Sequence, residues 1–263
     1  MPHRGFSEKK EIMASLSKLV DYCNDRVFSY KIKDFPGSLN GLQVENDGEV
    51  KKVGAAVDAG LVPFRIASEK GIDFLIVHHG LYWAPPAPLT QTNYEKIKLC
   101  LDHNLAIYSS HLPLDCHPEI GNNAIIASKL ELSPISTFLD YEGTDIGLIT
   151  SYANSRKDLR ASLDHLFSRG ITSMEFGPDR PSKVAILSGS GQSAFDQLRN
   201  HEADTFITGE LKQSHFNLAQ EMKINVYTCG HYATETFGVK ALGQEVAENF
   251  CIPFEFIDTQ CPL

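Results

Sequence analysis

The sequence predicts an α/β protein of two domains, each a three-layer arrangement of a sheet flanked by helices, with a cleft at the carboxyl ends of the strands. Short apolar runs of strand length alternate with amphipathic stretches of helix length. Polar motifs that contain histidine follow several of these runs, at the edge where open α/β sheets bind ligands. The 263 residues also exceed the roughly 100 to 150 residues of a common domain. These features favour two α/β units over one.

Each strand is predicted where an apolar run is too short for a helix. Each helix is predicted where apolar residues recur with helical spacing over a longer stretch. In chain order, the predicted strands cover residues 53–58, 73–77, 106–110, 146–151, 183–187, 205–208, 225–228 and 254–257. The predicted helices cover residues 11–23, 61–70, 93–103, 122–130, 156–167, 192–200, 212–222 and 234–249.

Residues 83–88 read Trp-Ala-Pro-Pro-Ala-Pro, and their prolines exclude both a helix and a central strand, so a loop is expected there. Tyr82 and Trp83 at its start either form a stacking edge for a substrate or pack against the loop. Breaks near residues 133 and 229 divide the chain into a discontinuous domain, 1–133 plus 229–263, and an inserted domain, 134–228. The final helix and strand would then rejoin the N-terminal half.

The composition narrows the classes of partner. The chain has 24 Lys and Arg against 33 Asp and Glu, a formal net charge of −9, which disfavours nucleic acid and anionic membranes. No apolar run approaches the roughly 18 residues of a membrane span, and the first residues lack the apolar middle of a secretory signal. The six cysteines form no C-x-x-C pair. We therefore expect a soluble, cytoplasmic protein.

The first candidate motif is Val77-His78-His79-Gly80, at the end of the predicted strand 73–77. Consecutive histidines on a regular strand point to opposite faces, but at a strand end the backbone can turn both into one cleft. The alternative is a pair of polar residues on a surface turn, and paired histidines alone are a weak signal.

The second motif, Ser-Ser-His-Leu-Pro-Leu-Asp, follows the predicted strand 106–110 and places His111 and Asp115 four residues apart. Pro113 excludes an ordinary helix interior, so the two side chains are expected to converge through an irregular loop. Alternatively, Asp115 caps the helix that follows or binds loop amides.

The third motif, Gly-His-Tyr-Ala-Thr-Glu, follows the predicted strand 225–228. If this segment is helical, His231 and Glu235 share one face, and both can reach a single ion. Alternatively, Thr234 or Thr236 caps the final helix, and Glu235 simply favours the positive end of that helix.

Together the three motifs supply imidazole and carboxylate groups, the mixture that borderline divalent metals prefer. There are more candidate ligands than one tetrahedral ion needs, so we predict two ions about 3.5 to 4 Å apart that share a carboxylate and a bridging water. Zn, Fe, Mn, Co and Ni all suit such ligands. The candidates are His78, His79, His111, Asp115, His231 and Glu235.

Two further residues are candidates for proton transfer. Glu210 follows an apolar strand and is either a general base, an acidic partner of a ligand, or a carboxylate at a helix start. His215 lies on the next predicted helix and faces either the cleft or solvent. The segment Gly-Ser-Gly-Gln-Ser at 189–193 can cradle a phosphate, but it lacks the lysine of a P-loop, which favours a tight turn.

The ordered motifs resemble the Ngg-interacting-factor-three-like family, whose members are also known as type 2 homologues of GTP cyclohydrolase 1 or as dinuclear metal centre proteins. The resemblance covers nearly the whole chain and matches the short family form, without an inserted domain. The segments that carry it are Asn-Gly-Leu-Gln-Val at 40–44, Val-His-His-Gly at 77–80, Ser-Ser-His-Leu-Pro-Leu-Asp at 109–115, Thr-Gly-Glu-Leu at 208–211 and Gly-His-Tyr-Ala-Thr-Glu at 230–235.

The resemblance implies two α/β domains, two metal ions in the cleft and a homohexameric ring. It implies Glu235 as the bridging ligand and places His111 near the ions, either as a ligand or as a group that orients Asp115 or a bound water. In two places the chain departs from the family pattern: Ser38-Leu39 replaces Trp-Asp, and Tyr232 replaces a second histidine. The implied metal ligands are His78, His79, Asp115, His231 and Glu235.

The chemistry predicted from these residues is hydrolysis of a small molecule at a dinuclear metal centre, with Glu210, His111 or His215 moving protons. The substrate class extends to nucleotides and phosphate compounds. One alternative is a metal-binding protein without catalysis, such as a metallochaperone or an interaction scaffold. A GTP cyclohydrolase activity is a further alternative, and it rests on the family name alone.

Overall fold

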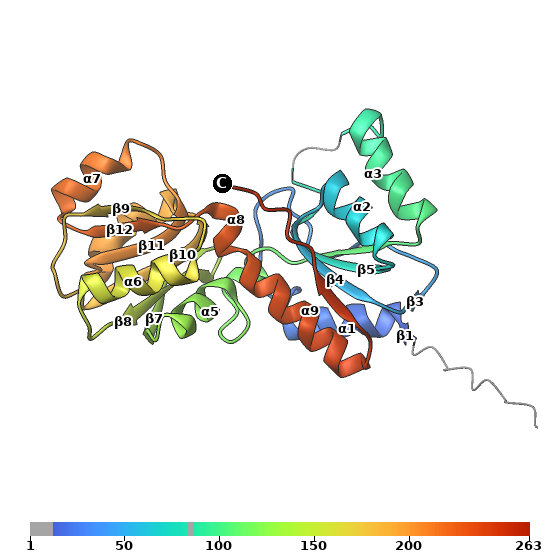
Figure 1. The fold of residues 1–263 in the computed structure, drawn as a ribbon, viewed down its shortest axis with the longest axis horizontal. Helices are drawn as coiled ribbons and strands as arrows, with labels where there is room; N and C mark the ends of the chain where they lie inside the picture. The colour runs from blue at the N-terminus through green and yellow to red at the C-terminus, as the bar shows by residue number, and fades with distance from the viewer. Residues whose placement is uncertain (1–12, 84–86) are drawn as a thin grey trace, which may run out of the picture.

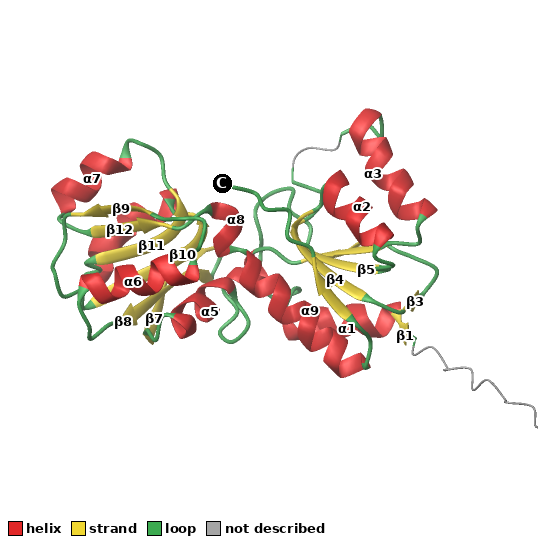
Figure 2. Cartoon of the chain, in the orientation of Figure 1, coloured by secondary structure: helices red, strands yellow, loops and turns green. Residues whose placement is uncertain are grey.

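The structure is a computed structural model that describes residues 13–83 and 87–263. Its strands form two main sheets, which lie on opposite sides of the molecule (Figures 1 and 2). One sheet has the strand order β13-β4-β5-β6-β2, with β2 alone antiparallel to its neighbour. Its strands are β2 (Gly41–Val44), β4 (Val53–Asp58), β5 (Phe74–His79), β6 (Ala106–Ser109) and β13 (Phe254–Phe256).

The second sheet has the strand order β7-β8-β10-β11-β12-β9. Its three central strands are parallel, and the other three are antiparallel to their neighbours. A small antiparallel ribbon pairs β1 (Ala14–Ser15) with β3 (Glu49–Val50). The six strands are β7 (Ser133–Tyr141), β8 (Thr144–Ser151), β9 (Thr172–Glu175), β10 (Lys183–Ser190), β11 (Thr205–Glu210) and β12 (Asn225–Thr228).

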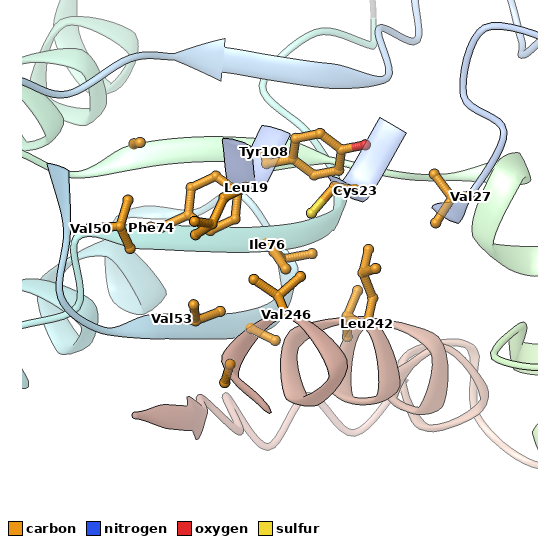
Figure 3. Close-up of a cluster of buried hydrophobic side chains, with 14 of the residues drawn as sticks. Leu19, Cys23, Val27, Val50, Val53, Phe74, Ile76, Tyr108, Leu242 and Val246 are labelled. Carbon is orange, nitrogen blue, oxygen red and sulfur yellow. The ribbon is translucent and has the colours of Figure 1, made fainter. Parts of the chain in front are cut away.

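Alternation of side chains along the strands buries both faces of the five-stranded sheet. Phe74 and Ile76 pack with helices α1 (Leu16–Arg26) and α9 (Thr236–Phe250), as Figure 3 shows. Leu75 and Val77 point the other way, toward helices α2 (Leu61–Glu69) and α3 (Gln91–Asp102). A strand covered on both faces requires an almost continuous apolar run, and Phe-Leu-Ile-Val is such a run.

The six-stranded sheet is covered in the same way. Val184 and Ile186 pack with α5 (Asn122–Lys129) and α6 (Arg156–Leu166). Ala185 and Leu187 pack with the 3₁₀ helix η1 (Gln192–His201) and α7 (His215–Met222). Each sheet therefore forms the middle of three layers, as the alternation of apolar runs and amphipathic stretches predicts.

The short helix α8 (His231–Thr234) and the long helix α9 lie between the two halves (Figure 1), and the short helix α4 (Leu112–Asp115) contacts α9, α5 and β8. Helix α4 follows β6 of one sheet, whereas α8 follows β12 of the other. The amide of Gly238 on α9 donates to Asn122 Oδ1 at 2.7 Å. A Cβ atom at Gly238 would lie 2.7 Å from Leu114 Cγ, so only glycine allows this close approach. The ends of strands from both sheets are thereby brought to one place.

The structure corrects several element predictions. Helix α1 begins at Leu16 rather than at residue 11, and residues 11–12 lie outside the described part of the chain. The predicted helix 234–249 is two helices that break at Glu235, and the predicted helix 212–222 begins only at His215. His78 and His79 are the last two residues of β5 rather than residues beyond it. The prolines of residues 84–86, in the predicted loop, also lie outside the described residues.

The strands that the sequence analysis missed are short, or lie at sheet edges where a long apolar run is not needed. Strand β7 is an edge strand with mostly exposed residues, and β9 is the opposite edge. The strands of the five-stranded sheet lie before residue 133 and after residue 229, and those of the six-stranded sheet lie within 133–228. The domain boundaries near 133 and 229 stay a prediction. Within residues 13–83 and 87–263, no helix is long and apolar enough to cross a membrane.

Candidate metal centre

Four histidines and a glutamate meet where the two sheets approach each other. His78 and His79 end strand β5, and His111 lies between β6 and α4. His231 begins α8, and Glu235 occupies the break between α8 and α9. The three predicted motifs therefore do meet in space, although they come from strands of two different sheets.

The carboxylate of Glu235 is at the centre of this group and is 2% exposed. Its Oε1 lies 3.1 Å from His231 Nε2 and 3.6 Å from His78 Nε2, and its Oε2 lies 3.3 Å from His79 Nε2. The predicted i,i+4 pairing of His231 and Glu235 is thus present, with Glu235 directly after the single turn of α8. The two oxygens face different histidines, which is the arrangement that a bridging carboxylate needs.

Asp115 approaches the same group from α4. Its Oδ2 lies 3.4 Å from His78 Nε2, while its Oδ1 accepts hydrogen bonds from Asn122 Nδ2 and Ser188 Oγ, each at 2.8 Å. Asp115 was expected to reach the site through an irregular loop, but the segment forms one helical turn. Pro113 is compatible with that turn because the first residues of a helix need no backbone N–H donor.

Two overlapping sets of ligand atoms each gather within 4.8 Å. One set comprises His78, His79 and His111, and the other comprises His79, His231 and Glu235. The sets share His79, so positions suited to cations adjoin each other. Nitrogen and oxygen donors of these kinds suit Zn and its first-row neighbours.

An acceptor holds the Nδ1 atom of each of the four histidines. His78 Nδ1 lies 2.9 Å from the carbonyl oxygen of Ser110, and the other three Nδ1 atoms face carboxylates. The carboxylate distances are 2.8 Å for His79 to Asp58 Oδ1, 2.8 Å for His111 to Asp34 Oδ1, and 3.2 Å for His231 to Glu210 Oε1. Metal-binding histidines typically donate their second ring nitrogen in this way, which fixes the ring and leaves the opposite nitrogen free to coordinate.

The electrostatics of the cluster favour positive charge at its centre. Burial alone would lower the pKa of His78, but the carboxylates of Asp115 and Glu235 outweigh burial and raise this pKa well above its usual value. The hydrogen bond with Glu235 raises the pKa of His231 to about 9. Burial would raise the pKa of Glu235, yet His78 and His231 hold it well below its usual value. Two buried carboxylates therefore require cations, either protons on the histidines or metal ions.

Three buried side-chain atoms among the described residues have no hydrogen-bond partner, and two of them belong to this cluster: His78 Nε2 and Glu235 Oε2. Buried polar atoms are nearly always paired, and an unpaired one costs about 1 to 3 kcal/mol. Bound divalent cations would give both atoms a partner. The residues present thus fit a metal ion.

Sequence reasoning missed Asp34 and Asp58. Asp34 Oδ1 accepts from the amide of Phe35 and from His111, and Oδ2 accepts from Asn40 Nδ2 and from the amide of Leu112. Burial would raise the pKa of Asp34, but the hydrogen bond and charge of His111 lower it overall. Asp58 ends β4 beside β5, opposite His79. The signal for Asp58 was available, because it too lies at the carboxyl end of a predicted strand.

The three residues predicted to move protons differ in position. His111 lines the cavity beside the cluster, and Glu210 ends β11 and lies beside His231. His215 does not line this cavity among the described residues. Its Nδ1 lies 3.1 Å from the carbonyl oxygen of Lys212, and its ring packs on Phe195. A catalytic role for His215 therefore stays a prediction that this geometry does not support.

The glycines of the predicted tight turn at 189–193 have packing roles. Gly189 has φ +63°, and a Cβ atom there would collide with Glu235 Oε1. A Cβ atom at Gly191 would collide with Thr208 Oγ1. Gly189 thus lets the end of β10 approach the central carboxylate.

A cavity of about 500 Å³ opens onto the cluster. Its lining combines aromatic residues, histidines, the two carboxylates and a row of hydroxyl and amide groups. The lining residues that bear on chemistry are Phe35, His79, Trp83, His111, Asp115, Ser188, Ser190, Gln192, Ser193, His231 and Glu235. The centre therefore borders a cavity large enough for a small molecule.

A family model, curated relatives and a solved structure all match this chain over most of its length. The family model for Duf34/NIF3 (NGG1p interacting factor 3) matches residues 17–262. A protein of Archaeoglobus fulgidus named GTP cyclohydrolase 1 type 2 homolog is 37% identical over 246 residues, which cover 93% of this chain and 98% of the relative. A protein of the same name from Deinococcus radiodurans is 36% identical and covers 84% of this chain and 85% of its own length. The crystal structure of TTHA1606 from Thermus thermophilus superimposes with a TM-score of 0.86 at 36% identity, covering 95% of this chain and all of that one.

Proposed function

The chain belongs to the Duf34/NIF3 family, and from that premise we propose that it binds two divalent metal ions and hydrolyses a small molecule in the cavity beside them. The observation that carries the proposal is the set of four histidines whose Nδ1 atoms are held by acceptors while buried ligand atoms at the centre lack partners. In a cluster with a purely structural role, His78 Nε2 and Glu235 Oε2 would be expected to have hydrogen-bond partners.

The proposed ligands are those predicted from the sequence. Glu235 faces three histidines and is the proposed bridge. Bound divalent ions supply a water of lowered pKa as nucleophile and a Lewis acid for the substrate. The ligand set is His78, His79, Asp115, His231 and Glu235.

The residues around the ligands have separate roles in this proposal. Asp58 and Glu210 fix the rings of His79 and His231 through their Nδ1 atoms. Asp34 accepts a hydrogen bond from His111 Nδ1, so that Nε2 of His111 is the nitrogen that would take a proton from the attacking water and pass it to the leaving group. His111 serves either in this role or as an additional ligand, because its ring also lies in one of the two ligand sets.

A test uses metal-loaded protein with three chromogenic probes: p-nitrophenyl acetate, p-nitrophenyl phosphate and bis-p-nitrophenyl phosphate. We expect hydrolysis of at least one probe, and a fall of about 10²-fold or more in the His111→Gln variant if this residue moves the proton. His165→Gln, an exposed histidine on α6, is the matched control and should not change the rate. If fully loaded protein hydrolyses none of the probes, the hydrolase proposal is not supported and metal carriage becomes the better explanation.

Metal carriage is the second candidate, and the exposure of the site favours it. The side chains of His231 and Glu210 are 30% and 48% exposed, so this side of the cluster is open to solvent. A carrier should pass its metal rapidly to a competing chelator, whereas a hydrolase should retain it through repeated turnover. The half-time of transfer to a chromogenic chelator distinguishes the two.

A GTP cyclohydrolase activity is suggested only by the name of the relatives. None of the described residues that line the cavity is Lys or Arg, the side chains that usually bind a triphosphate. We therefore expect neither formate nor a pterin precursor when loaded protein is incubated with GTP, and detection of either product would reinstate this activity.

We also propose that the protein works in the cytoplasm as a homohexameric ring, as the family resemblance implies. All six cysteines are free, which suits a reducing compartment. Exposed apolar side chains such as Leu101 on α3 and Ile135 on β7 are available for contacts between subunits. Light scattering behind size exclusion should give six times the mass of the chain, and a monomer at micromolar concentration would contradict the ring.

A further inference from the structure

The cavity beside the metal centre has an aromatic edge, formed by Phe35 and Trp83. Their exposed fractions are 38% and 36%, although both are large apolar side chains. The centroid of the Trp83 ring lies 4.5 Å from that of His111 and 5.3 Å from that of His79, and the Phe35 ring lies 5.7 Å from His111. Exposed aromatic surface within a cavity is available to a ligand, and it commonly provides the contact area that binds a planar ring.

A second edge of the same cavity is polar and uncharged. Ser190 ends β10, and Gln192 and Ser193 begin η1. Among the hydrogen bonds of the described residues, none involves the side chains of these three residues, unlike Ser188, whose hydroxyl donates to Asp115. Two hydroxyls and one amide are therefore available as donors and acceptors for a bound molecule.

The charges of the lining disfavour an anionic group away from the metal centre. Asp115 and Glu235 are the charged residues among those described around the cavity, apart from the histidines, and both belong to the proposed ligand set. A phosphate or carboxylate beyond the metal ions would thus meet hydroxyls and aromatic rings without a cationic partner, at a cost in desolvation.

We propose that this cavity binds an uncharged, planar nitrogen heterocycle, whose ring stacks on Phe35 and Trp83 and whose edge groups bond with Ser190, Gln192 and Ser193. The inference rests on the proposed function in taking the cavity as the substrate site, and it adds the chemical class of the substrate. The volume of about 500 Å³ holds a molecule of nucleoside size. The heterocycle would lie beside the proposed metal ligands.

Trp83 provides a direct readout, because it is the single tryptophan of the chain. We would titrate metal-loaded protein with adenosine, an uncharged planar probe, and in parallel with ribose 5-phosphate, an anionic probe without an aromatic ring. Stacking of the base on Trp83 should quench the tryptophan fluorescence in a saturable way, whereas ribose 5-phosphate should not. Saturable binding of ribose 5-phosphate without binding of adenosine would overturn the proposal.

Two variants test the edges separately. Phe35→Leu removes a ring while keeping an apolar side chain, and it should weaken the adenosine affinity about fivefold or more, as expected for one lost stacking partner. Gln192→Ala removes an amide that has no hydrogen bond within the described protein, so it should weaken binding without disturbing the fold. Tyr82→Leu, a neighbouring exposed aromatic outside the described cavity lining, is the control and should bind as the wild type does. Equal affinities in all three variants would place the probe elsewhere and refute the proposal.

The same titration on metal-free protein separates this inference from the metal proposal. If the protein takes up no metal when it is supplied but adenosine still quenches its fluorescence, the heterocycle site is supported and the metal-dependent hydrolase proposal is wrong. A protein that takes up metal but shows no response to adenosine, by fluorescence or by calorimetry, would remove the heterocycle site and leave the metal centre intact.

Discussion

Asp34 is not a candidate metal ligand, but it holds the ring of His111 beside the metal centre. Its two oxygens accept four hydrogen bonds, from Phe35, Asn40, His111 and Leu112, and its side chain is 4% exposed. A single carboxylate thereby ties the segment before β2 to the histidine at the end of β6. Its position in a loop, outside any periodic pattern, is the reason that sequence reasoning did not find it.

Asp34→Asn should destabilise the protein by about 1 to 3 kcal/mol near neutral pH, because an amide nitrogen cannot accept the bonds that one carboxylate oxygen accepts. The pKa of Asp34 is lower in the folded protein than its usual value, so this stabilisation is present above the usual pKa and is lost as the pH falls through the lowered one. Urea unfolding at several pH values should show the difference from wild type shrinking in acid. Asp140→Asn, at an exposed position on β7, is the control; a difference that grows in acid would contradict the role given to Asp34.

The candidate ligands themselves were predictable because chemistry-bearing residues occurred in three motifs, each just after or at the end of an apolar run. His78 and His79 illustrate what was missing. The motif indicated that both face one cleft, but the carbonyl of Ser110 and the carboxylate of Asp58 that orient their rings come from neighbouring strands. The partners of a residue across a sheet depend on the order of the strands, and the pattern of residues in one sequence does not reveal that order.

Among the secondary-structure elements, the end of β10 lies close to the central carboxylate. Gly189 has φ +63° and no room for a Cβ atom, because Glu235 Oε1 occupies that position. A side chain at Gly189 would therefore displace Glu235 rather than adjust itself.

Gly189→Ala should lower the bound metal to less than half of the wild-type content. Gly71→Ala is a matched control, because Gly71 has φ +65° but open space around its Cβ position. Both variants should lose roughly 1 kcal/mol from backbone strain, and only Gly189→Ala should lose metal. Elemental analysis after dialysis against the metal measures this, and equal metal contents in the two variants would show that the close approach is unimportant.

Elements were predictable to different degrees for physical reasons. Buried inner strands such as β4 and β12 have the predicted bounds. The run Val-Gly-Ala-Ala-Val makes β4 easy to recognise, and the first three residues of β12 are buried. Edge strands such as β7 expose most of their residues and show no such run. The sequence pattern around Glu235 is that of one continuous helix, but the structure has a break between α8 and α9 at this residue. Glu235 contacts three histidines from other parts of the chain and from α8, and such contacts leave no signal in the local pattern.

The candidate metal ligands come from the ends of strands in both sheets. Metal binding should therefore stabilise the whole protein. The metal-free protein should stay folded, because its carboxylates are compensated by histidines and four large apolar clusters remain. Ions at about a thousandfold excess over their dissociation constant should add roughly 4 kcal/mol for each independent site. Calorimetry of chelated and reloaded protein should therefore show a rise in Tm of roughly 2 to 4 °C per kcal/mol. Unfolding on chelation would instead indicate a structural role for the ions.

The measurement that decides most is the metal content of the purified, untagged protein, determined by plasma mass spectrometry beside the Glu235→Gln variant. Glu248→Gln, an exposed position on the same helix α9, serves as the control. A dinuclear centre predicts about two equivalents of a divalent transition metal per chain in the wild type and the control, and a loss of most of it in Glu235→Gln. Wild-type protein that is free of metal and takes up none when it is supplied would contradict the metal centre and, with it, the proposed hydrolysis.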